Sequence, residues 1–158
     1  MTQSAITRRD VAARLHDLDP SWMDVWSSDN AHMHRTLELA ASLLGDQQPR
    51  YAEVQAGVAA PKFVLVVIAD DRVVRVDGAV DGGWPRATVV PRHELRALTL
   101  LETPHQPLDF GELSSDSVAV ALDFGAFTVE LPSKRNGRRG RVLAELLPSL
   151  LADRVSAR

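Results

Sequence analysis

Apolar and polar positions in the first third of the chain follow a helical period. Val11, Leu15 and Leu18 recur at helical spacing, and the Thr-x-x-Asp pattern that starts at Thr7 is typical of a helix N-terminus. Pro20 tolerates the first position of a helix, and apolar residues continue after it. The pattern therefore predicts that the chain begins with helices. The later apolar positions of this region are Trp22, Val25, Trp26, Met33, Leu37, Ala40, Ala41 and Leu44.

The hydrophobic period changes to two after residue 49, which indicates strands. A continuous apolar run predicts a buried strand over 63–69, and the short polar break after it predicts a tight hairpin. Strict alternation on both sides of Gly125 predicts a second hairpin. For 95–102 a strand is expected, with a helix as the alternative. The expected strands cover 51–56, 63–69, 72–76, 87–90, 95–102, 118–124 and 127–131, with a polar loop at 103–117.

The last element is an amphipathic helix that follows a basic segment. Residues 134–141 carry five cations and two glycines, and we expect them to form a flexible loop. Pro148 lies inside the helix and should kink it or open a second short helix. The apolar face of this helix consists of Val142, Leu143, Leu146, Leu147, Leu150 and Leu151.

Composition and charge narrow the class of protein. The chain has 158 residues, of which 45% are apolar and 25% charged, as in an ordinary globular domain. It contains no cysteine, which excludes disulfides and thiolate chemistry. The net charge is −3, yet residues 132–158 carry +5, so the body of the protein is acidic. Nucleic acid is therefore an unexpected partner. No export signal or membrane segment is visible, and we expect a cytoplasmic protein.

The motifs of common enzymes are missing from the sequence. It has no Gly-x-Ser-x-Gly motif and no glycine-rich phosphate loop with a lysine. His32 and His34 are two residues apart, so on a helix they point in different directions and make a poor ligand pair. We therefore expect no catalytic residues, no metal site and no cofactor, and a protein that is not an enzyme.

Three segments, at 43–46, 63–78 and 89–98, together have the pattern of a helix end before a first strand, a central hairpin, and a further strand with its turn. In this they resemble the bacterial pleckstrin-homology-like (PH-like) and GRAM-type domains. The resemblance covers roughly residues 43–153 and implies an α+β fold: a curved antiparallel sheet, or partly open barrel, capped by a C-terminal helix. We accordingly expect a PH-like domain at 43–158, preceded by a helical extension at 1–42.

The resemblance implies a binding module, because such domains usually bind proteins, peptides or lipids, and bacterial members often self-associate. We expect a protein partner or a homo-oligomer, engaged through a sheet edge, the helical extension or the basic segment. The alternative is a peripheral membrane module in which the basic segment binds anionic lipid. The cations concerned are Lys134, Arg135, Arg138, Arg139 and Arg141. They could equally form a solvated surface loop.

Tryptophans are the other candidate contacts. Trp84 follows two glycines and precedes a proline, so it is expected in a loop, either tucked under the sheet or exposed for a partner. Trp22 and Trp26 are four residues apart and share one helical face. That face either packs in the core or anchors a partner.

Overall fold

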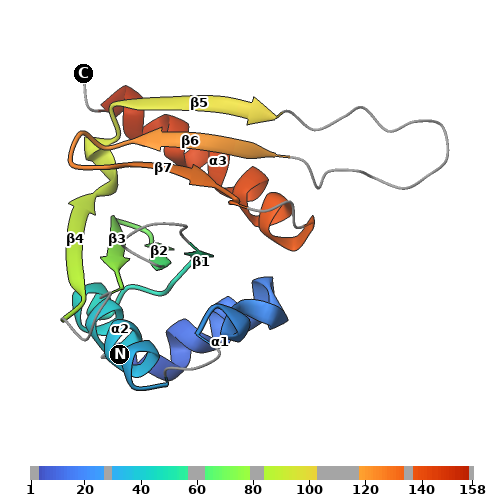
Figure 1. Cartoon of the computed structure of the whole chain (residues 1–158). Coiled ribbons are helices and arrows are strands. Elements are labelled where there is room, and N and C mark those ends of the chain that lie inside the picture. The colour runs from blue at the N-terminus through green and yellow to red at the C-terminus, as the bar shows by residue number, and fades with distance from the viewer. Residues whose placement is uncertain are drawn as a thin grey trace, which may run out of the picture. The chain divides into compact units, whose positions relative to one another are not determined.

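A computed structural model describes residues 4–26, 30–56, 63–78, 84–102, 118–133 and 137–156. The chain forms two compact units, Met1–Val90 and Pro91–Arg158. The first contains a four-stranded sheet and the second a three-stranded sheet, and both sheets are antiparallel (Figure 1). The α+β class expected from the sequence is therefore confirmed, as is a helix at the C-terminal end.

The first unit begins with helices and continues with a meander of strands. In sheet order its strands are β1, β2, β3 and β4, so neighbours in sequence are neighbours in space. The segment after Pro20 is a 3-10 helix rather than an α-helix. The elements are α1 (Arg8–Leu18), η1 (Pro20–Trp26), α2 (Asn30–Leu44), β1 (Tyr51–Ala56), β2 (Phe63–Ile68), β3 (Arg72–Asp77) and β4 (Arg86–Pro91).

The predicted hairpin over the apolar run is confirmed by the pairing of β2 with β3. Val67 lies opposite Val74 and Leu65 opposite Val76 in antiparallel register. Gly78 follows the hairpin, and a Cβ atom placed there would lie 1.8 Å from the ring of Phe63. Only glycine therefore allows the aromatic ring to pack against the backbone at this position.

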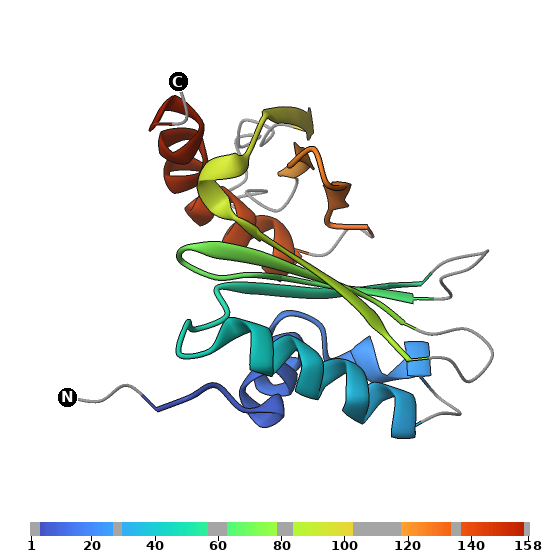
Figure 2. The same ribbon diagram turned by 90° about the vertical axis from the view of Figure 1, so that its left-hand side faces the viewer.

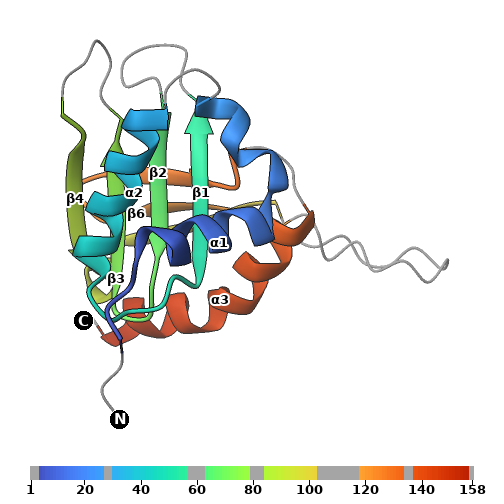
Figure 3. The same ribbon diagram turned by 90° about the horizontal axis from the view of Figure 1, so that it is seen from below.

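Helices α1 and α2 cover one face of the four-stranded sheet (Figure 3). Their apolar residues and alternate residues of the strands form one buried cluster, which includes Leu15, Leu37, Leu65, Val67 and Val74. Helices α1 and α2 thus supply part of the core of the first unit, because the sheet needs them to bury this face. The two compact units meet after residue 90. A PH-like domain at 43–158 with a helical extension at 1–42 stays a prediction.

The second unit pairs a small sheet with the last helix. Its elements are η2 (Arg92–Glu94), β5 (Ala97–Glu102), β6 (Ala119–Asp123), β7 (Thr128–Leu131) and α3 (Gly137–Ser156). The sheet order is β5-β6-β7, and α3 lies along the sheet (Figure 1). The strand interpretation of the region before residue 102 is confirmed, and the helical alternative is wrong. The expected loop at 103–117 lies outside the described residues.

The turn between β6 and β7 depends on a glycine. Gly125 has φ +79°, a conformation that residues with a side chain rarely adopt. Its backbone N–H donates to the Asp123 carboxylate at 2.7 Å. The predicted hairpin is confirmed, because Leu122 pairs with Val129 and Asp123 with Thr128.

One expectation about the C-terminal region needs correction. Helix α3 already begins at Gly137, so the part of the basic segment from Gly137 onward is helical and not a flexible loop. Pro148 lies inside one helix of 20 residues, so of its two alternatives the second short helix is wrong, and the kink stays a prediction. No helix within the described ranges is both long and apolar enough to cross a membrane.

Candidate functional site

Trp84 lies on the surface of the first unit, immediately before β4. Its side chain is 76% exposed, so it is not tucked under the sheet. The guanidinium of Arg35, on α2, lies 4.7 Å from the centre of the Trp84 ring, within the range of a cation–π contact. Figure 2 shows why the two meet, because the start of β4 lies beside the N-terminal half of α2. We call Trp84 and Arg35 the Trp–Arg patch.

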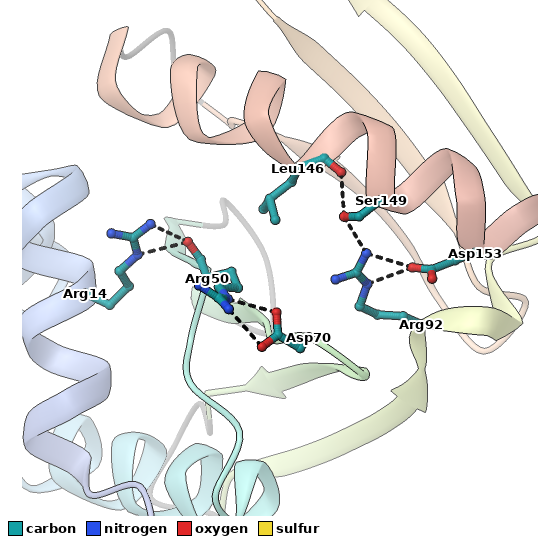
Figure 4. Close-up of polar contacts among 7 residues, drawn as sticks. All are labelled: Arg14, Arg50, Asp70, Arg92, Leu146, Ser149 and Asp153. Carbon is teal, nitrogen blue, oxygen red and sulfur yellow. Dashed lines mark hydrogen bonds and ion pairs between the residues drawn. The ribbon is translucent and has the colours of Figure 1, made fainter.

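Six other arginines among the described residues bind a carboxylate or a backbone carbonyl. Arg50 binds the Asp70 carboxylate at 2.8 and 3.0 Å, and Arg14 donates to the backbone carbonyl of Arg50 at 2.9 Å (Figure 4). Arg8 pairs with Glu38 at 2.7 Å. Further pairs are Arg72 with Asp71, Arg75 with Asp77, and Arg92 with Asp153.

No carboxylate or carbonyl among the described residues accepts a hydrogen bond from Arg35. Glu38 lies one helical turn from Arg35 but forms its ion pair with Arg8. Arg35 is exposed. An arginine held over an aromatic ring has a restricted orientation and can still bind a carboxylate or phosphate in bidentate fashion.

No family model, curated sequence or solved structure matched this chain. Any role of the patch therefore has to be argued from its own chemistry. Tryptophan, tyrosine and arginine are the residue types most enriched among those that carry the binding energy of protein interfaces. The Trp–Arg patch combines both types, one of them highly exposed.

The cations of the basic segment at 134–141 differ in their burial. Arg138 and Arg141 are exposed on the first turns of α3, whereas Arg139 is only 3% exposed. Lys134 and Arg135 lie outside the described residues. The described cations therefore do not form one charged surface, because Arg139 points inward. The sequence did not predict this, since the segment was expected to be a loop without an inner and an outer side.

The other two tryptophans are Trp22 and Trp26, both on η1. Trp22 is 5% exposed and belongs to the core cluster of the first unit, so the core interpretation is confirmed for this residue. Trp26 ends η1, and its side chain lies outside the described residues. Among the side chains that the structure describes, no three metal-ligating groups come together.

A buried carboxylate on β1 was not singled out by the sequence. Glu53 is fully buried and accepts hydrogen bonds from the hydroxyl of Tyr51 and, at 3.3 Å, from the side-chain amide of Gln55. The three residues alternate along the strand and so share one face. Because both carboxylate oxygens have donors, we assign Glu53 a structural role. The polar alternation of β1 was the only signal in the sequence that could have indicated it.

A depression of about 430 Å³ lies between the segment before α1 and helix α2. The ion pair of Arg8 with Glu38 contributes to its wall, and the backbone N–H of Ile6 donates to the carbonyl of Gly45 at 2.7 Å. The hydroxyl of Ser42 donates to the carbonyl of Glu38. These polar groups are engaged with one another, so the depression presents little chemistry to a ligand.

Proposed function

We propose that this protein is a non-enzymatic interaction module that binds a protein partner, or a second copy of itself, through the Trp–Arg patch. The observation that carries the proposal is the 76% exposure of Trp84 under a cation without a carboxylate partner among the described residues. Leaving a large aromatic side chain in water forgoes about 1.5–3 kcal/mol of burial. A partner that covers the ring recovers this free energy.

The PH-like arrangement expected from the sequence is part of the same proposal. Four antiparallel strands, then three antiparallel strands and then one helix agree with the element order of the resemblance. In this proposal the helices at 1–42 are an addition that completes the core of the first unit. The cytoplasmic location expected from the sequence stays a prediction.

Affinity capture with matched variants tests the proposed function. Trp84→Ala should reduce the recovery of the partner from an extract of the source cells by about tenfold, as for a residue at the centre of an interface. Val155→Ala is the matched control, because Val155 on α3 is 75% exposed and should be neutral. Sedimentation velocity of both variants distinguishes self-association from a separate partner. Equal recovery with Trp84→Ala and Val155→Ala, without a change in association state, would contradict the proposal.

Binding of anionic lipid through 134–141 is the alternative function, and the exposure of Arg138 and Arg141 favours it. Each cation near an anionic surface contributes about 1 kcal/mol. Arg138→Glu together with Arg141→Glu should then abolish co-sedimentation with anionic vesicles at low salt, whereas neutral vesicles should not bind. Arg139 should be left unchanged, because its burial means that a substitution could unfold the protein. Absence of binding by the unaltered protein would exclude the alternative.

A further inference from the structure

Strand β4 is the last strand of its sheet among the described strands, so one of its edges has no neighbouring strand. Only Pro85 separates Trp84 from the first residue of this strand. Its side chains Arg86, Thr88 and Val89 are exposed, the last by 38%. An edge of this kind presents backbone N–H and C=O groups that can pair with an added strand.

The segment from Trp84 to the end of β4 carries a single charge, which is positive. Residues 84–91 contain Arg86 and no acidic residue. Arg86, like Arg35, forms no ion pair with any other residue that the structure describes. Ala87 packs against the core cluster on the side of α2, so Arg86, the residue before it in the strand, projects from the opposite face of the sheet. The two exposed cations, Arg35 on α2 and Arg86 on β4, therefore lie on the two sides of this edge. This favours an acidic ligand even though the whole chain has a net charge of −3.

We propose that the partner presents an extended acidic segment that adds as a fifth strand to the free edge of β4. Its carboxylates bind Arg35 and Arg86, and one of its apolar side chains covers Trp84. Backbone pairing supplies affinity along the edge, while the Trp–Arg patch and Arg86 supply the preference for acidic sequences. This inference rests on the proposed function, because it uses the same patch and specifies the kind of partner.

Fluorescence anisotropy with defined peptides tests the inference. The probe is a labelled decapeptide in which pairs of aspartates alternate with pairs of valines, so that each face of the added strand carries both residue types. Its counterpart carries lysine in place of aspartate. We expect the acidic peptide to bind about tenfold more tightly than the basic one. Trp84→Ala, Arg35→Glu and Arg86→Glu should each weaken its binding about fivefold or more, whereas Val155→Ala should change it less than twofold. Circular dichroism checks that each variant is folded.

Backbone methylation of the peptide tests strand addition itself. Successive residues of a strand direct their N–H groups to opposite edges. Methylation of two central amides on one edge should therefore weaken binding about tenfold, and methylation of the two neighbouring amides should leave it nearly unchanged.

The possible failures of this experiment are distinguishable. Equal binding of both methylated peptides, with loss of binding in Trp84→Ala, would overturn strand addition and leave the proposed function standing. Binding that does not respond to Trp84→Ala or Arg35→Glu would show that the Trp–Arg patch is not the binding site, and would contradict both the proposed function and the strand addition. No binding of the acidic peptide, or equal binding of the basic one, would overturn the inferred acidic partner.

Discussion

At the scale of single residues, the Thr7–Asp10 cap at the start of α1 contributes to the stability of the folded protein. The Asp10 carboxylate accepts hydrogen bonds from the hydroxyl and the backbone N–H of Thr7, each at 2.7 Å. The side-chain hydrogen bond is the main cause that lowers the pKa of Asp10, and the backbone bond adds to it. The charged carboxylate also lies at the positive end of the helix dipole.

We predict that Asp10→Ala lowers the free energy of unfolding by about 1 kcal/mol at pH 7. Because the pKa of Asp10 is lower in the folded state, its contribution is present above the unfolded pKa of about 4 and is lost as the pH falls through the folded pKa. The difference between the two proteins should therefore shrink in acid. Urea unfolding from pH 7 to pH 2.5 measures it. Asp24→Ala, an exposed aspartate on η1, is the control, and an equal effect there would contradict the assignment.

At the scale of elements, one arginine joins η2 to α3 within the second unit. Arg92 is 4% exposed, and its guanidinium donates to the carboxylate of Asp153 at 2.8 Å and to the hydroxyl of Ser149 at 2.7 Å (Figure 4). The Ser149 hydroxyl donates in turn to the carbonyl of Leu146, which leaves its oxygen free to accept from Arg92. A buried charge is stable only when it is paired in this way.

We predict that Arg92→Ala lowers the free energy of unfolding by about 2–3 kcal/mol, because it leaves the Asp153 carboxylate without its cation. Arg154 follows Asp153 on α3, and Arg154→Ala also removes one positive charge. This control should lower the free energy of unfolding by less than about 0.5 kcal/mol. Denaturant titration of both variants compares them. Similar losses would show that charge alone, and not this contact, is responsible.

At the scale of the whole molecule, helices α1 and α2 supply part of the core of the first compact unit. We predict that a chain truncated to 43–158 does not fold cooperatively, because removal of α1 and α2 exposes one apolar face of the four-stranded sheet. Circular dichroism and binding of a hydrophobic dye measure this. A cooperative unfolding transition without dye binding would instead support the boundary after residue 42 expected from the sequence.

Much of the secondary structure could be predicted, and the candidate site only in part. Trp84 was singled out as a loop tryptophan, but its partner Arg35 was not, because a cation–π contact between residues 49 positions apart leaves no local pattern. The inward position of Arg139 was missed for a related reason. An arginine in a run of cations gives no indication of which side of a helix will face the interior.

The sequence by itself determined most of the described elements, because periods of 3.6 and 2, a Thr–Asp cap and glycines at turns act within a few residues. It also determined the α+β class. Tertiary structure decided which elements share a core, which strand lies at the edge of its sheet, and which arginines form ion pairs with carboxylates. Those outcomes depend on contacts between distant parts of the chain, such as α2 with β4, and local preferences do not specify them.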